Sequence, residues 1–260
     1  PAGGFVHVDL DPSVFGAAYP HARTLGIPAE IGGFLRGLLE AWPSGLQPRL
    51  AASGVRPFPA APSPRPGRVR PSYLASVVQS QIVARTDSIV LTEAGNAFAI
   101  GSHYLSFDGP RYRVSSGFGS MGQASAGVLG AALGSRRKAV ALVGDGALLM
   151  LNEINTAATY GIDAVWIVLN DAGYRMIAQG MQAVGWQTFE TEFTRADFVS
   201  IARAMGGDGV RVEREEDVTA ALQTALAAHG PFVVDVIVDP EERAPSGNRN
   251  QSLLRQGLSA

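Results

Sequence analysis

The stretch of residues 139–171 constrains the fold of this chain more than any other part. It reads AVALVGDGALLMLNEINTAATYGIDAVWIVLND, in which an apolar run, an acidic turn, a helical pattern and a second apolar run follow one another. This order predicts strand, helix and strand, the βαβ unit of a parallel sheet. Both turns then lie at the carboxyl ends of their strands, so we expect Asp145 and Asp171 to lie close in space. The apolar residues of the helical pattern are spaced for one buried face: Leu148, Leu149, Ile154, Ala157 and Ala158.

Two carboxylates at neighbouring strand ends would repel each other and raise each other's pKa. A divalent cation between them removes that repulsion, and oxygen ligands suit Mg²⁺ or Ca²⁺, with phosphate oxygens and water completing a Mg²⁺ shell. The glycines beside Asp145 allow the backbone to approach a phosphate, and a helix start at Ala147 supplies N–H donors. These residues therefore predict a metal–diphosphate site, although two ordinary tight turns explain them equally well.

The same residues resemble the thiamine diphosphate fingerprint, and their flanks resemble the acetolactate synthase-like branch of that family. The resemblance covers nearly the whole chain. It implies that Mg²⁺ on the cofactor's diphosphate is held by Asp145, Asp171 and the backbone carbonyl of Gly173. The sequence departs from the family pattern at Asp171, where the family usually has Asn. Its spacing is also one residue short, near residues 151–152.

Other segments complete the cofactor site that the resemblance implies. Gly95 and Asn96, which follow an expected strand at residues 88–92, are expected to contact the diphosphate. Residues 117–122, GFGSMG, resemble a family segment whose bulky residue props the cofactor in a bent form, and Met121 occupies that position. The full set of expected cofactor-binding residues is Gly95, Asn96, Gly119, Ser120, Met121, Asp145, Gly146, Ala147, Asp171, Gly173, Tyr174 and Met176.

The segment after Asp171 resembles a mobile segment that closes over cofactor and substrate in the family. Met176 and Gln179 fit its GM…Q pattern. Branched-chain acetolactate synthases carry a tryptophan after that glutamine, whereas this chain has Gly180, which leaves room for a bulkier acceptor. We therefore expect Gln179 and Gly180 to belong to the substrate pocket.

Residues 117–122 also match the G-x-G-x-x-G dinucleotide fingerprint, so a nicotinamide-dependent oxidoreductase is an alternative. Three features argue against it. The residues before Gly117 are polar and charged and form a poor strand. Asp145 sits between two glycines, which suits a phosphate better than a ribose, and the alternative gives Asn170 and Asp171 no role.

The chain as a whole predicts an α/β fold in four parts. Residues 1–42, with the segment HVDLDP, resemble the end of the family's central α/β domain. Residues 43–70 form a proline-rich linker, and residues 71–240 the diphosphate- and magnesium-binding domain. This domain is expected to be a doubly wound parallel sheet of about six strands with helices on both faces. Residues 241–260 form a tail or a lid.

Composition limits the partners of the chain. There is no cysteine, which excludes disulfides and thiolate chemistry. The net charge of −2 without a basic block argues against nucleic acid as a partner. No apolar run is long enough to span a membrane, and we expect a soluble cytoplasmic protein.

The resemblance implies a thiamine diphosphate- and Mg²⁺-dependent decarboxylation of a 2-oxo acid such as pyruvate, followed by addition to a carbonyl acceptor. Simple decarboxylation and a non-catalytic partner subunit are alternatives. In the family, a glutamate on a separate pyrimidine-binding domain activates the cofactor, whereas Glu93 and Glu153 lie in the diphosphate domain. We therefore expect activity only with a pyrimidine-binding domain from another chain or a severed segment, within a homo- or hetero-oligomer.

Overall fold

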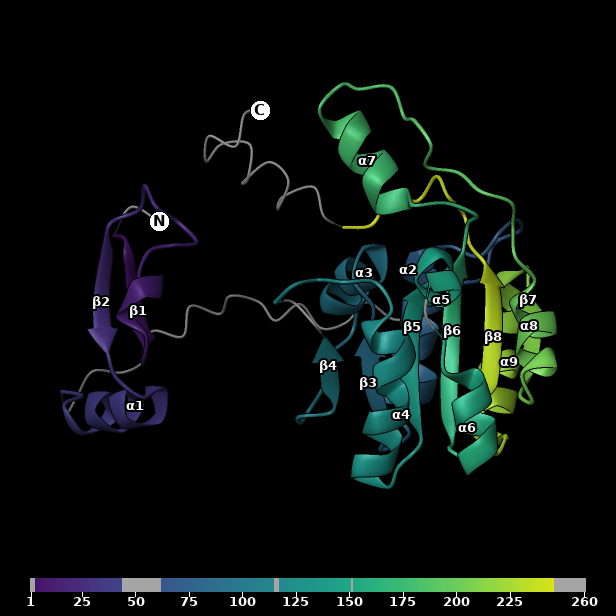
Figure 1. Cartoon of the computed structure of the whole chain (residues 1–260), viewed down its shortest axis with the longest axis horizontal. Coiled ribbons are helices and arrows are strands. Elements are labelled where there is room, and N and C mark those ends of the chain that lie inside the picture. Colours follow the sequence, from purple (N-terminus) through teal and green to yellow (C-terminus); the bar gives the residue numbers. More distant parts are fainter. Residues whose placement is uncertain (1–2, 44–61, 115–116, 151, 246–260) are drawn as a thin grey trace. The chain divides into compact units, whose positions relative to one another are not determined.

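The computed structural model describes residues 3–43, 62–114, 117–150 and 152–245 (Figure 1). The described residues fall into two compact units, residues 3–43 and residues 62–245.

The first unit is a small two-stranded parallel sheet followed by one α-helix. Strands β1 (Phe5–Asp9) and β2 (Thr24–Pro28) pair in parallel, and α1 (Ile31–Glu40) follows them. Strand β2 is the short segment TLGIP, which ends in proline and lacks a clear alternation of apolar and polar residues. None of the described residues of this unit is fully buried, so its apolar residues do not form a closed core.

The second unit is built on a six-stranded sheet in the order β4-β3-β5-β6-β8-β7. All strand pairs are parallel, which confirms the expected α/β fold. The strands are β3 (Ile89–Thr92), β4 (Tyr112–Val114), β5 (Ala139–Gly144), β6 (Ala164–Asn170), β7 (Asp208–Val212) and β8 (Phe232–Ile237).

Successive residues of a strand point to opposite faces of the sheet, and the apolar runs place buried residues on both faces. Helices therefore cover both faces. Val140 and Leu142 of β5 pack in a core with α2, α3 and α9, whereas Ala141 and Val143 pack in a core with α4, α6 and α8 (Figure 1). The helices of the unit are α2 (Pro71–Val78), the π-helical turn η2 (Gln79–Val83), α3 (Asn96–Tyr104), α4 (Gln123–Ser135), α5 (Asp145–Met150), α6 (Ile154–Tyr160), α7 (Arg175–Ala183), α8 (Phe198–Ala204) and α9 (Glu215–Ala227).

The helix expected between β5 and β6 differs from the prediction. It is two helices, and α5 begins at Asp145, two residues before the expected start at Ala147. Leu149 is 48% exposed and does not belong to a buried face, whereas Leu148 and Ile154 are buried. Glu153, the N-cap of α6, has φ −116° and ψ 30°, which are not helical values. The spacing of apolar residues alone does not predict this break between α5 and α6.

The residues before the glycine-rich segment also differ from the prediction, because Tyr112–Val114 forms the edge strand β4. The Tyr112 hydroxyl hydrogen-bonds Thr92 Oγ1 at 2.7 Å, which ties this short polar strand to β3. One argument against a dinucleotide site is therefore wrong. A structural one replaces it: β4 and β5 are separated by β3, whereas the first two strands of the dinucleotide-binding fold are neighbours.

The described ends of the expected linker and tail pack on the second unit. The buried Glu215 carboxylate accepts hydrogen bonds from the main-chain N–H groups of Arg65 and Arg70 and from the Arg70 guanidinium. Glu242 accepts a hydrogen bond from the N–H of Ser72 at 2.8 Å. Residues 44–61 of the expected linker and residues 246–260 of the expected tail or lid lie outside the described residues.

Among the described residues, no helix is both long and apolar enough to cross a bilayer.

Candidate active site

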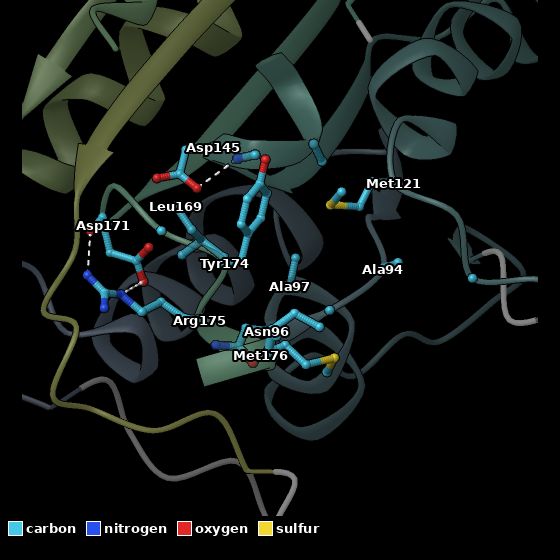
Figure 2. A pocket seen from close by; sticks show the side chains of 17 residues that line it. Ala94, Asn96, Ala97, Met121, Asp145, Leu169, Asp171, Tyr174, Arg175 and Met176 are labelled. Carbon is cyan, nitrogen blue, oxygen red and sulfur yellow. Dashed lines mark hydrogen bonds and ion pairs between the residues drawn. The ribbon is translucent and has the colours of Figure 1, made fainter. Parts of the chain in front are cut away.

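A cavity of about 450 Å³ opens at the carboxyl ends of β3, β5 and β6, within the size range of small-molecule sites (Figure 2). Every expected cofactor-binding residue lines this cavity except Ser120. Ser120 is exposed and lies in sequence between the lining residues Gly119 and Met121. The lining residues are Ala94, Gly95, Asn96, Ala97, Gly119, Met121, Gly144, Asp145, Gly146, Ala147, Leu169, Asp171, Gly173, Tyr174, Arg175, Met176 and Ile177.

Asp145 joins the two strand ends at the floor of this cavity. Its side chain is buried, and Oδ1 accepts a hydrogen bond from Gly146 N at 2.7 Å. Oδ2 accepts one from Ala172 N, also at 2.7 Å, so the turn after β5 is bonded to the turn after β6. Burial raises the pKa of Asp145, and these main-chain hydrogen bonds oppose the shift. The two turns therefore meet, as the βαβ pattern predicted.

Asp171 lies in the second turn and pairs with a cation instead. Its side chain is 14% exposed, and Oδ2 lies 3.5 Å from Nε of Arg175 (Figure 2). Burial and the charge of Asp145 raise the pKa of Asp171 to about 7, while Arg175 and Arg195 act in the opposite direction. The charge of the buried Asp145 thus disfavours the ionised form of the partly buried Asp171, and a divalent cation between the two carboxylates would remove this conflict.

A buried polar network fixes the base of the second turn. The Asn170 amide donates to Asp235 Oδ1 at 2.7 Å, and Arg195 donates to Asn170 Oδ1 at 2.9 Å. Arg211 in turn donates to Asp235 Oδ2 at 2.9 and 3.0 Å. Since all polar atoms of the buried Asn170 side chain are used, the network sets the position of the chain that continues into Asp171.

Two helices begin at the cavity wall, which makes the wall suited to an anion. Neither α3 nor α7 has a side-chain hydrogen bond at its N-cap, so their first N–H groups are not capped in this way. The N-cap of α3 is Gly95, whose φ of +83° favours glycine and at which a Cβ would meet no atom within 4 Å. The wall therefore offers accessible main chain and favourable helix dipoles to a diphosphate.

The glycine after Asp145 is required by close packing. A Cβ on Gly146 would come within 2.7 Å of the Tyr174 ring, which stands against this turn (Figure 2). Met121 is 37% exposed and enters the cavity on the side away from Asp171 (Figure 2). The cavity thus has a polar side formed by the two aspartates and an opposite side that contains a flexible apolar group.

The expected substrate-pocket residues do not line the main cavity. Gln179 lines smaller cavities, one of them beside Asp171 and the other beside Arg243 of the tail. Gly180 is exposed on α7. Their assignment to a substrate pocket stays a prediction.

Sequence reasoning missed Arg175, a cavity residue whose charge lowers the pKa of Asp171. A signal was present: Arg175 follows Asp171 by four residues, which is the spacing of neighbours on a helix. Some uncharged lining residues were also missed, because small and apolar residues at strand ends and helix starts are common in any parallel α/β sheet: Ala94, Ala97, Gly144, Leu169 and Ile177.

Comparison with known families matches residues 93–236 to the C-terminal TPP binding domain of thiamine pyrophosphate enzymes. The chain belongs to this family. The match contains all the cofactor-binding residues expected from the sequence, and it runs through residues 117–122, which a nicotinamide-dependent enzyme would use for its dinucleotide. It therefore favours the thiamine diphosphate interpretation over the dinucleotide one.

Relatives of the thiamine pyrophosphate enzyme family support the acetolactate synthase-like resemblance. The chain is 31% identical over 249 residues to a putative acetolactate synthase large subunit, IlvB2, of Mycobacterium tuberculosis, covering 92% of this chain and 44% of that protein. It is 26% identical to the large subunit of acetolactate synthase isozyme 1 of Escherichia coli, covering 98% of this chain and 47% of that one.

A solved structure agrees with the fold of this family. The thiamine diphosphate-dependent 4-hydroxybenzoylformate decarboxylase of Rhodococcus jostii RHA1 is 26% identical, with a TM-score of 0.73. The match covers 92% of this chain and 44% of the decarboxylase. The chain thus spans less than half the length of each of these proteins.

Proposed function

We propose that this chain supplies the diphosphate- and magnesium-binding half of an acetolactate synthase-like active site. The assembled enzyme decarboxylates a 2-oxo acid such as pyruvate and joins the product to a carbonyl acceptor. The observation that carries the proposal is the pair of the buried Asp145 and the partly buried Asp171 at adjacent strand ends, in a cavity of a thiamine pyrophosphate-binding domain.

The donor set fits Mg²⁺. Asp145 and Asp171 supply carboxylate oxygens, and Gly173 supplies a main-chain carbonyl in the same turn. The described residues contain no group of three or more His, Cys, Asp or Glu that could form a purely protein-ligated metal site. A hard cation held by few protein oxygens would complete its shell with phosphate oxygens and water, as Mg²⁺ does.

The remaining cavity residues bind and orient the cofactor. Thiamine diphosphate, when bound, supplies the carbanion stabilisation that decarboxylation needs. The start of α3, which has no side-chain cap, would hold the diphosphate through its N–H groups. Met121 would support the cofactor from the other side of the cavity, and the buried Leu169 adds apolar surface to the cavity lining.

The activating glutamate comes from a pyrimidine-binding domain that is not part of residues 1–260. Glu93 is buried and accepts hydrogen bonds from the N–H and the hydroxyl of Ser125, at 3.1 and 3.0 Å. Glu153 accepts one from the Thr156 hydroxyl at 2.5 Å, beside α6. Both glutamates thus have structural partners, which supports a second polypeptide or segment, and an oligomer, as the source of the missing group.

Simple decarboxylation is the second candidate function. It is favoured by the structural similarity to a thiamine diphosphate-dependent decarboxylase. The two reactions share the donor half of the chemistry and differ in the fate of the product, so product analysis separates them.

The test has two stages. Calorimetric titration of the chain with thiamine diphosphate is expected to show binding with Mg²⁺ and none with EDTA; binding that does not depend on the metal would contradict the metal assignment. The chain is then combined with a pyrimidine-binding domain and supplied with pyruvate. A ligated hydroxyketone product supports carboligation, release of aldehyde alone supports decarboxylation, and no carbon dioxide release opposes both. Cytoplasmic location stays a prediction that cell fractionation tests.

A further inference from the structure

Arg175 contacts both of the proposed metal-ligating residues in the turn after β6. Its Nη2 donates to the main-chain oxygen of Asp171 at 2.9 Å, and its Nε lies 3.5 Å from the Asp171 carboxylate. A Cβ on Gly173 would come within 3.2 Å of Arg175 Cζ, so the guanidinium packs directly on that glycine. Arg175 therefore covers the turn that the proposed function assigns to a divalent ion.

The same guanidinium has an alternative partner in solvent. Its Nη1 donates to Glu192 Oε1 at 3.2 Å, and the Glu192 side chain is 76% exposed. Arg175 Nε, in contrast, is buried and makes no hydrogen bond to any of the described residues, although it faces the Asp171 carboxylate (Figure 2). The contact with Asp171 is thus an ion pair that is held by charge rather than by an aligned hydrogen bond.

We propose that Arg175 is the resident counter-ion of Asp171, and that a divalent ion binds the turn only when the guanidinium releases Asp171 and keeps Glu192. This inference rests on the proposed function and adds to it a competition at the metal site. A guanidinium and a divalent ion cannot both approach one carboxylate closely, because their charges repel and they need the same oxygen atoms. Arg175 is therefore a positioning residue that sets the metal affinity through Asp171.

The first test is Arg175→Gln, with Mn²⁺ as the probe in titrations followed by electron paramagnetic resonance, without thiamine diphosphate. In the pH range above the pKa of Asp171, which Arg175 lowers, removal of the competing cation should lower the Mn²⁺ dissociation constant by about tenfold. A merely structural arginine would give the opposite result, since its loss would loosen the turn and weaken the binding of Mn²⁺. Arg175→Lys keeps the charge and should stay within about twofold of the unsubstituted chain.

A double-variant cycle separates competition from simple charge removal. Glu192→Gln leaves Asp171 as the carboxylate partner of Arg175, so it should raise the Mn²⁺ dissociation constant by about threefold. In the Arg175→Gln background the same change should have no effect, whereas a direct field effect of Glu192 would persist there. Arg214→Gln removes one positive charge from a surface ion pair with Asp217 and should leave the constant unchanged.

The outcomes distinguish this inference from the function on which it rests. If the unsubstituted chain binds Mg²⁺ and thiamine diphosphate but Arg175→Gln, folded by circular dichroism, binds Mn²⁺ no more tightly, the competition is wrong and the function stands. If no variant binds Mn²⁺ and thiamine diphosphate binding does not need metal, the metal assignment fails and the competition with it. Tighter Mn²⁺ binding in Arg175→Gln and weaker binding in Glu192→Gln support it.

Discussion

The strand ends of β5 and β6 carry the same residue type at the same edge of the sheet, yet they hold it in different ways. Asp145 is fixed by the main chain, because each carboxylate oxygen accepts an N–H group, from Gly146 and from Ala172. Asp171 is held by the side chain of Arg175, at 3.5 Å. One carboxylate is therefore positioned by the fold itself, and the other by a partner that can move.

This difference assigns different tasks to the two groups. A carboxylate that accepts main-chain hydrogen bonds moves only if the backbone moves, so Asp145 is a rigid ligand and also a structural bond between two turns. A carboxylate that pairs with a long side chain can exchange partners at small cost. The comparison predicts that substitutions of Asp145 damage both binding and folding, whereas substitutions of Asp171 change the charge of the site more than its shape.

The largest effect is expected for Asp145→Ala. The change removes a charged ligand, so the Mg²⁺-dependent affinity for thiamine diphosphate should fall by at least about 100-fold. Calorimetric titration in the presence and absence of Mg²⁺ measures it. Asp217→Ala, which removes an exposed carboxylate from α9, is the control and should bind normally. Unchanged affinity in Asp145→Ala would remove Asp145 from the metal site.

The asparagine variants test the same comparison through stability. Both carboxylate oxygens of Asp145 accept hydrogen bonds from main-chain N–H groups, so the amide NH₂ of Asp145→Asn must face one of these N–H donors. This variant should lower the free energy of unfolding by about 1–3 kcal/mol. Asp171→Asn removes a buried charge without such a clash. It should leave stability unchanged or raise it by up to about 1 kcal/mol at pH 8 without metal.

Urea unfolding at equal ionic strength measures both variants. Equal losses of stability in the two would show that the main-chain hydrogen bonds of Asp145 do not distinguish the two strand ends. A loss confined to Asp171→Asn would reverse the comparison.

The pH dependence of metal binding should follow Asp171. Its pKa is raised to about 7 from an ordinary 3.8, so the folded metal-free chain holds a proton there that an unfolded chain releases at much lower pH. A metal must displace that proton, so Mg²⁺-dependent affinity should fall as pH falls below about 7, by up to about tenfold per pH unit. In Asp171→Asn the fall should begin at lower pH. The same pH profile in both proteins would assign the titration to another group.

The sequence predicted the parts of this site that follow from alternation and chain order. The apolar runs before Asp145 and after Ile162 specify two buried neighbouring strands, and parallel pairing brings their ends together. That reasoning needs no side-chain geometry, which is why the sheet, the βαβ unit and the meeting of the two turns were all anticipated.

The sequence did not predict the features that depend on tertiary contacts. The break between α5 and α6, the edge strand β4 and the ion pair of Arg175 with Asp171 each depend on neighbours distant in the chain or on one local turn. The apolar period of residues 148–158 is compatible with one helix or with two. Polar residues in β4 argue against a strand until the bond between Tyr112 and Thr92 is known.

The smallest effect on binding is expected for Met121→Ala, on the side of the cavity away from the two strand ends. Thiamine diphosphate affinity should stay within about twofold, because the change leaves Asp145 and Asp171 intact. Turnover of the assembled enzyme should fall by about fivefold, since loss of the prop relaxes the reactive geometry. Met150→Ala, which shortens an exposed methionine outside the cavity, is the matched control and should leave both quantities unchanged. Normal turnover in Met121→Ala would show that Met121 only fills space in the cavity. A large loss of thiamine diphosphate affinity would show that Met121 contributes to diphosphate binding, so that the binding site is not confined to the two strand ends.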